Sequence, residues 1–292
     1  MNEQQQKVSK IKQDIQSRIV EALSKASNDE FSLEAWDYEQ GSGGGLTRVV
    51  LGDVLEKGGV NYSGINGVMN KEIAPDMKQE PNTPFFATGV SLVIHPKNPF
   101  VPTTHMNVRY FQTDQNWWIG GGIDLTPYYF EEEDVKEFHQ KIKNTCDRYD
   151  SSYYPKFKKW CDDYFYLPHR KETRGLGGIF YDYLNHDLDE CLSFNQAVGD
   201  CFIDCFVPFI NKYKDKPYSA EEKEFQKYRR GRYAEFNLVY DRGTKFGFKT
   251  AGRTESILMS LPPEAIWKYN WQPKRGSSEA KLYEYLKPID WI

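Results

Sequence analysis

The stretch from residue 31 to residue 126 constrains the fold of this chain more than any other part of its sequence. Short runs rich in β-branched and aromatic residues alternate there with glycine-rich segments; the runs include LTRVVL, VSLVIH, MNVRYF and WWIGGGI, and the segments include GSGGG, GDVLEKGG and NYSGING. This pattern predicts β-strands joined by turns. The gaps are too short for crossover helices, so we expect mainly antiparallel pairing.

Helical patterns lie on both sides of this strand-rich stretch. Before it, apolar residues recur at steps of three and four from Val8 to Leu23, which predicts an amphipathic helix that ends near Ser27 and Asn28. After it, similar stripes and charged stretches predict helices over 131–149, 154–166, 193–213 and 220–229, with short ones over 255–261 and 279–286.

Three further segments have the composition of strands. GLGGIFYDYL (175–184) predicts one strand, and YAEFNLVY (233–240) and KFGFKT (245–250) predict a tight hairpin around the turn 241–244. No linker, repeat or low-complexity tract divides the chain. We therefore expect one α+β domain over residues 1–292, with a broad antiparallel sheet of about six or seven strands and helices packed over its faces.

Composition and charge exclude several classes of protein. Hydrophobic residues make up 39% of the chain, but no uncharged apolar run approaches the roughly 18 residues of a membrane span. The formal net charge is −4 and no basic block occurs, so we expect no nucleic-acid partner. An anionic ligand would then need individual arginines aimed at its carboxylates.

The cysteines and the N-terminus indicate an intracellular protein. The five cysteines form neither a C-x-x-C pair nor a zinc-ribbon spacing, which favours reduced thiols. The first 29 residues have no apolar core and mix acidic with basic residues, so they are a poor signal or transit peptide. We expect a cytoplasmic location.

The densest polar cluster is TTHMNVRYF, residues 103–111. Alternation along a strand places His105, Asn107 and Arg109 on one face and Val108 on the other. This polar face either points to solvent or, if helices cover both faces of the sheet, is buried. In the second case Arg109 would require an anionic partner or ligand.

Two further clusters have both a structural and a functional interpretation. Gly120, Gly121 and Gly122 either bend their strand or let a flat ligand approach it, and Asp124 after them could simply begin a turn. Asp241 is either a turn residue or a base. Arg253 is either solvated or free to reach a ligand carboxylate.

Four histidines could be read as a metal site, namely His95, His105, His139 and His169. No H-x-x-x-H or H-E-x-x-H spacing supports this, and we expect His139 and His169 to be satisfied or surface histidines. The sequence also lacks a helix-opening G-x-G-x-x-G, a Walker lysine motif and the clustered cysteines of an iron–sulfur site.

Taken together, several long segments resemble the oxygen-dependent coproporphyrinogen III oxidase family over nearly the whole chain. They are GGGLTRVVLGDVLEKGGVNYSGINGV, FFATGVSLVIHPKNPFVPTTHMNVRYF, WWIGGGIDLTPYY, FKKWCDDYFYLPHRKETRGLGGIFYDYL and RGRYAEFNLVYDRGTKFGFKTAGRTESILMSLPP. The resemblance implies an α+β fold with a flat antiparallel sheet flanked by helices on both sides. It also implies a homodimer, with residues 233–268 matching the part associated with dimer formation.

The resemblance further implies roles for particular residues. It implies a substrate contact at Ser91, a proton-transferring histidine at His105, and active-site aspartates at Asp124 and Asp241. The substrate-binding residues that it implies are Asn107, Val108, Arg109, Ala251, Gly252 and Arg253.

The implied reaction converts two propionates of coproporphyrinogen III into vinyl groups and gives protoporphyrinogen IX. It consumes dioxygen, releases carbon dioxide and hydrogen peroxide, and needs no flavin, haem or organic cofactor. A requirement for a divalent metal is left open, and we assign no residue as a metal ligand. Two alternatives stay open, a metal-dependent oxygenase that uses the four histidines and a non-catalytic porphyrin-binding protein.

Overall fold

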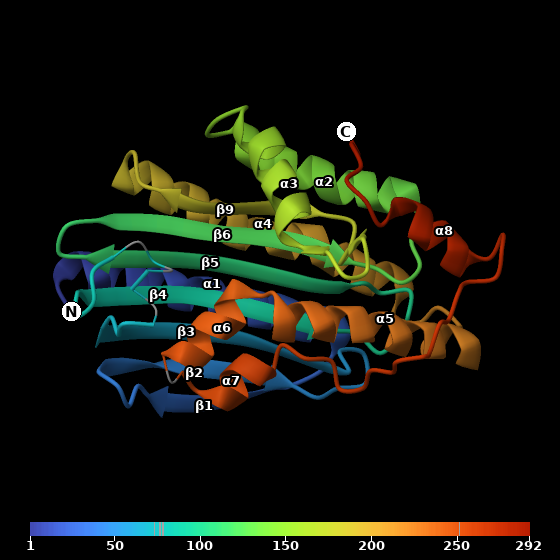
Figure 1. Cartoon of the computed structure of the whole chain (residues 1–292), viewed down its shortest axis with the longest axis horizontal. Coiled ribbons are helices and arrows are strands. Elements are labelled where there is room, and N and C mark those ends of the chain that lie inside the picture. Colours follow the sequence, from blue (N-terminus) through green and yellow to red (C-terminus); the bar gives the residue numbers. More distant parts are fainter. Residues whose placement is uncertain (73, 76, 78, 251) are drawn as a thin grey trace.

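A computed structural model describes residues 1–72, 74–75, 77, 79–250 and 252–292. Its centre is a seven-stranded antiparallel sheet with the order β1-β2-β3-β4-β5-β6-β9 (Figure 1). The strands are β1 (Phe31–Asp37), β2 (Ser42–Val50), β3 (Lys57–Val68), β4 (Pro84–His95), β5 (Thr103–Thr113), β6 (Trp117–Thr126) and β9 (Gly178–Leu184). The first six therefore follow one another in space as they do in sequence, as short turns require. Strands β7 (Tyr166–Leu167) and β8 (Glu172–Thr173) form a separate ribbon.

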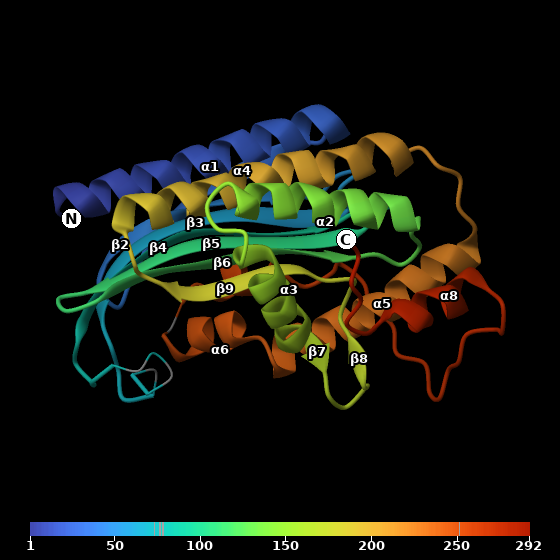
Figure 2. The same ribbon diagram turned by 90° about the horizontal axis from the view of Figure 1, so that it is seen from above.

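Helices lie on both faces of the sheet (Figure 2). One layer contains α1 (Glu3–Ser27), α2 (Glu132–Asp147) and α4 (Leu188–Tyr213), and α3 (Tyr153–Tyr164) packs against β9. Across the sheet lie α5 (Ala220–Val239), α6 (Arg242–Lys249) and α7 (Thr254–Leu258), with α8 (Ser278–Tyr285) beside α5. The predicted α+β class, the antiparallel pairing and the helices on both faces are confirmed.

The α1 and α4 side of the sheet holds the main hydrophobic core. Alternate residues of β4 and β5 point there, and Val90, Leu92, Met106 and Val108 are completely buried with Ile15 of α1 in the same cluster. Burial of each such side chain contributes about 1.5–3 kcal/mol. The residues between them point to the opposite face, which the helices cover only in part.

The predicted hairpin over 233–250 is wrong, because both of its strands are helical. Helix α5 continues to Val239 and α6 follows directly. Buried residues recur at steps of three and four, at Phe225, Arg229, Tyr233 and Phe236, so the aromatic residues that suggested a strand form the buried stripe of a helix. The short ribbon of β7 and β8 was not predicted.

Among the helices of the described ranges, none combines the length and the apolar character that crossing a membrane requires.

Candidate active site

The partly covered face of the sheet carries a row of polar residues that runs across four strands. The register places Thr47 opposite Asn61, Asn61 opposite Ser91, and Ser91 opposite Asn107. Because directly opposite residues of antiparallel strands share a face, these side chains point the same way. Ser91, Asn107 and the neighbouring Arg109 are half-buried, so this row forms a polar floor that stays accessible.

His105 stands at the end of this floor and is held by a buried ion pair. Its Nδ1 lies 2.8 Å from one oxygen of Asp124, and the other oxygen of Asp124 lies 2.7 Å from Nη2 of Arg174. Asp124 and Arg174 are each only 2% exposed. Within the described part of the chain, Nε2 of His105 has no hydrogen-bond partner, so it can exchange a proton with a bound molecule.

Asp124 is held in its charged form despite its burial. Burial alone would raise the pKa of this carboxyl group, but the Arg174 guanidinium and the hydrogen bond from His105 outweigh it and lower the pKa. Arg174 also lies against the rings of Phe165, Tyr233 and Phe236, at 4.1, 4.4 and 4.9 Å from their centroids. An ionised Asp124 can only accept hydrogen bonds, so it keeps the His105 proton on Nδ1.

Arg109 lies on the same face, and two polar neighbours, Asn107 and Asp182, hold its guanidinium in place. Its Nη1 donates to Asn107 at 2.8 Å, and its Nη2 lies 2.9 Å from Asp182 of β9. A Cβ atom on Gly120 would come within 2.4 Å of Asp182 and 2.7 Å of the guanidinium. The absence of a Cβ atom at Gly120 therefore leaves room for the ion pair between Arg109 and Asp182. The guanidinium is 5.6 Å from the ring of Phe180.

Asp241 lies on the helical layer above the floor, where it caps α6. One oxygen accepts from the amide and the hydroxyl of Thr244, at 2.7 and 2.9 Å, and the other accepts from the hydroxyl of Tyr164 at 2.9 Å. Burial and the neighbouring Asp241 raise the pKa of Tyr164, so its hydroxyl remains protonated. Asp241 is half-buried and beside Arg242, whose guanidinium is 5.0 Å from the Tyr164 ring.

Arg253 precedes the short helix α7 and reaches the edge of the sheet. Its Nη2 pairs with Glu34 of β1, the strand beyond Thr47 in the row described above. Helix α7 is itself tied to the row, because the backbone carbonyl of Ser256 accepts from Asn61 at 3.0 Å. Arg253 is thus partly exposed and paired with a carboxylate of the protein.

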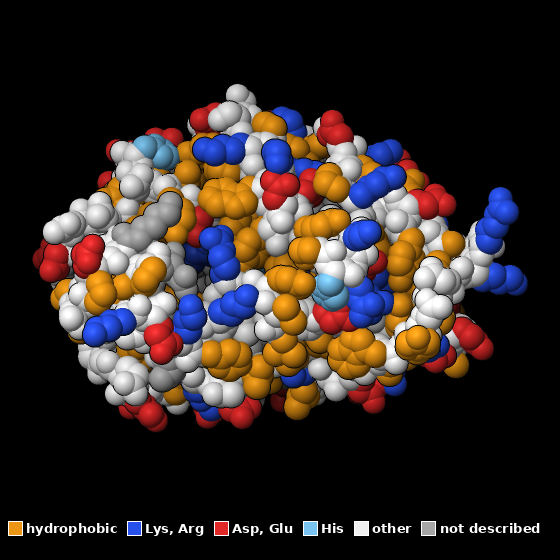
Figure 3. All heavy atoms as spheres, in the orientation of Figure 1, with side chains coloured by type: hydrophobic (Ala, Val, Ile, Leu, Met, Phe, Trp, Pro, Cys, Tyr) orange, Lys and Arg blue, Asp and Glu red, His pale blue; other side chains and the backbone are white. Residues whose placement is uncertain are grey.

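The structure places most, but not all, of the predicted site residues around this floor. Ser91, His105, Asn107, Arg109 and Asp124 meet there. The segment that contains Asp241, Gly252 and Arg253 lies on the same side of the sheet (Figure 1). The side chain of Val108 points into the main core instead, and Ala251 lies outside the described residues. Figure 3 shows this face hollowed to the left of its centre, with Lys and Arg side chains around the hollow.

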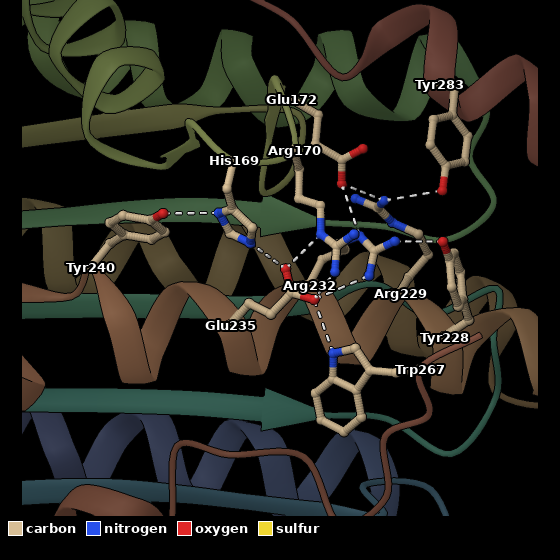
Figure 4. A network of polar contacts seen from close by, with 10 residues as sticks. All are labelled: His169, Arg170, Glu172, Tyr228, Arg229, Arg232, Glu235, Tyr240, Trp267 and Tyr283. Atoms are coloured by element: carbon tan, nitrogen blue, oxygen red, sulfur yellow. Dashed lines mark hydrogen bonds and ion pairs between the residues drawn. The ribbon is translucent and has the colours of Figure 1, made fainter. Parts of the chain in front are cut away.

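The four histidines have separate partners rather than a common centre. The partners are backbone carbonyls for His95 and His139, and the carboxylates of Asp124 for His105 and Glu235 for His169 (Figure 4). Burial lowers the pKa of His139 to about 3, so this histidine is neutral. Across the described ranges, no group of three or more His, Cys, Asp or Glu residues is arranged to hold a metal ion.

Three residues that shape the site were not predicted as such. Arg174 and Asp182 hold Asp124 and Arg109, and Tyr164 donates to Asp241. The one sequence signal for Asp182 is a single carboxylate inside the aromatic strand IFYDYL. Arg174 and Tyr164 carry no local signal, because their partners are far away in the sequence.

Comparison of the chain with models of known protein families finds a match over nearly its whole length. A family model described as coproporphyrinogen III oxidase matches residues 7–291 of the 292-residue chain. The matched range includes the polar floor, the helical segment above it, and Arg174, Asp182 and Tyr164, which hold the site residues in place.

Proposed function

Because this chain belongs to the coproporphyrinogen III oxidase family, we propose that it catalyses the oxygen-dependent oxidative decarboxylation of two propionates of coproporphyrinogen III to vinyl groups. The products are protoporphyrinogen IX, carbon dioxide and hydrogen peroxide. The observation that carries the proposal is the accessible polar floor, on which His105, backed by the buried pair of Asp124 and Arg174, shares one face of β5 with Arg109.

Binding of the substrate rests on the two arginines. Charge-assisted hydrogen bonds to propionates suit the planar guanidinium groups of Arg109 and Arg253. Arg253 would exchange Glu34, which is well exposed, for a propionate of the substrate. Ser91 and Asn107 supply neutral hydrogen-bonding groups between them. Holding the tetrapyrrole at several points fixes which propionate lies near the reacting groups.

The chemistry uses the substrate as its own reductant. Removal of a pyrrole N–H proton, for which Asp241 is the proposed base with Asp124 nearby, makes the ring electron-rich enough to attack dioxygen. The ring-bound peroxide takes a β-hydrogen of the propionate as a proton and, with a second proton from solvent, leaves as hydrogen peroxide with the electrons of its C–O bond. The carboxylate leaves as carbon dioxide, the C–C bonding electrons form the vinyl group, and the base returns its proton to the pyrrole nitrogen. Oxygen is reduced to hydrogen peroxide by two electrons, so the proposal requires no metal or organic cofactor. His105, through Nε2, moves a proton or binds a carboxylate.

Dioxygen dependence is the direct test of this proposal. Coproporphyrinogen III is incubated with the protein under air and under strict anaerobic conditions, and vinyl products are separated by chromatography. We expect vinyl products under air and none without dioxygen. Vinyl formation without dioxygen would contradict the oxygen-dependent reaction, and binding without turnover under either condition would favour a porphyrin-binding protein.

Replacing Arg109 with alanine should weaken substrate binding much more than folding. A hydrogen bond to a charged group contributes about 1.5–3 kcal/mol, which corresponds to a rise in KM of roughly tenfold to a hundredfold. KM and the urea midpoint are measured for Arg109→Ala and for a control, Arg18→Ala, which breaks an ion pair with Asp200 on the opposite layer. Equal losses of stability and activity in Arg109→Ala would favour a structural role.

A homodimer is expected to form through residues 233–268. This segment exposes Leu238, Val239 and Trp267 by 51%, 51% and 58%, and such a group of apolar side chains is typical of an interaction surface. Sedimentation velocity over a range of concentrations should show a dimer that Val239→Arg weakens. The control Leu51→Arg changes a leucine that is 76% exposed elsewhere. A monomer at all concentrations would contradict the prediction.

A further inference from the structure

The ion pair between Arg109 and Asp182 depends on an irregularity in β9. Ile119 pairs with Leu184 and Gly121 pairs with Tyr181, so two residues of β9, Asp182 and Tyr183, together face Gly120 of β6. This is the geometry of a β-bulge, which commonly redirects a side chain. Tyr183 has a φ of 58°, in the left-handed region that non-glycine residues rarely adopt. Some other contact must therefore hold the bulge in place.

A buried amide on α4 supplies such a contact from the opposite side of the sheet. Nδ2 of Asn195 donates to the backbone carbonyl of Gly120 at 3.1 Å and to the hydroxyl of Tyr181 at 2.8 Å. Asn195 is completely buried. Both of its acceptors lie at the bulge, since Tyr181 is the last regularly paired residue of β9 before it and Gly120 is the residue of β6 opposite it. A single amide thus ties α4 to the irregular part of both strands.

The orientation of this amide is set by a buried lysine on α1. Nζ of Lys12 donates to Oδ1 of Asn195, and the backbone carbonyl of Gly120 can only accept, so the amide oxygen faces Lys12 and the amide nitrogen faces Gly120. Lys12 is completely buried, and burial lowers its pKa to about 7. Fully buried lysines are rare, and the core position of this one is costly without a specific partner.

We propose that Asn195, oriented by Lys12, is a positioning residue: it anchors the β6–β9 bulge and so sets the Arg109–Asp182 pair for binding a propionate of the substrate. The inference rests on the proposed role of Arg109. It connects the α1 and α4 layer on one face of the sheet to the polar floor on the other face through Gly120. The carbonyl of Gly120 accepts from Asn195, and the absence of a Cβ atom there leaves room for the Arg109–Asp182 pair. A purely structural amide would satisfy the same buried groups without affecting the binding of substrate.

The test compares Asn195→Asp with a matched control. An aspartate still accepts from Lys12 but presents an oxygen to the carbonyl of Gly120, so the anchoring bond is lost. Gln16→Glu makes the same chemical change in α1, where the buried amide of Gln16 donates to the carbonyls of Leu46 and Val60 at 2.7 and 2.6 Å. KM and kcat for coproporphyrinogen III and the urea midpoint are measured for both variants.

We expect Asn195→Asp to raise KM about fivefold to tenfold, the range for one lost hydrogen bond, with kcat within about threefold of wild type. Gln16→Glu should lose stability to a similar degree without the change in KM. Combined with Arg109→Ala, Asn195→Asp should add almost nothing to KM, because residues that act through one another are not additive. If Asn195→Asp does not fold, Lys12→Met and Gln16→Leu make the same comparison.

Two results would overturn the inference and can be told apart. If Arg109→Ala raises KM but Asn195→Asp behaves like its control, or raises KM equally in the Arg109→Ala background, Asn195 does not position Arg109. If Arg109→Ala itself keeps a wild-type KM, the proposed role of Arg109 fails and the inference fails with it.

Discussion

Asp124→Asn should lower turnover by about a hundredfold or more, and it should also lower the free energy of unfolding by roughly 3–5 kcal/mol. The loss of turnover follows because a neutral amide no longer forces the His105 proton onto Nδ1. The loss of stability follows because Arg174, which is 2% exposed, keeps its charge without a carboxylate partner. Measurements of kcat and of urea unfolding check both effects.

The matched control for this prediction is Glu172→Gln. Glu172 is 7% exposed and pairs with the buried Arg229 at 2.6 Å, in a network that contains none of the residues of the polar floor (Figure 4). The control should lose a comparable amount of stability and keep most of its turnover. If both variants lose turnover in proportion to stability, the pair beneath His105 is structural and the proposed proton chemistry does not use it.

Asp241→Asn should lower kcat by about a hundredfold or more while the protein remains as stable as wild type to within about 1 kcal/mol. Asparagine is as good a helix cap as aspartate, so the bond from the amide of Thr244 survives. A carboxylate that removes a pyrrole proton has no such substitute. Substrate binding should change little, since Arg109 and Arg253 are intact.

The control for Asp241→Asn is the same substitution at another cap. Asp187 caps α4 by accepting from the amide of Glu190 at 2.9 Å, and it is exposed. Asp187→Asn should have wild-type kcat and stability. A well-folded Asp241→Asn enzyme within a few-fold of wild-type kcat would show that Asp241 is only a cap. Asp124, acting through His105, would then become the leading candidate for the base.

Local patterns predicted the sheet well because its faces differ in chemistry. Alternation along residues 103–111 correctly separated His105, Asn107 and Arg109 from Met106 and Val108, since one face packs against helices and the other stays polar. The antiparallel pairing was predicted from connections too short for crossover helices. Both signals come from residues close together in the sequence, so they can be recognised in a single sequence.

The helical layer above the floor was harder to predict because its local signals conflict. Residues 233–250 contain aromatic residues and two glycines, Gly243 and Gly247, which locally favour strands and turns. The structure nevertheless forms α5 and α6, because Tyr233 and Phe236 are buried on one helical face. Packing against the rest of the molecule outweighs the local preference.

The supports of the site depend on contacts between distant segments. Arg174 reaches Asp124 only because the loop before β9 lies against the end of β6, and Asp182 reaches Arg109 only because β9 is bulged. Neither contact follows from residue spacing. The sequence therefore indicated the residues on the floor, while the structure was needed for the residues that orient them.

On the proposed mechanism, the substrate reduces dioxygen on this floor without a cofactor. The most direct test counts the hydrogen peroxide released for each vinyl group formed under air by enzyme that has been exhaustively treated with chelator. We expect one hydrogen peroxide for each vinyl group, formed at the same rate as by untreated enzyme. Vinyl formation without peroxide, or activity that is lost on chelation and restored by one particular metal ion, would contradict it.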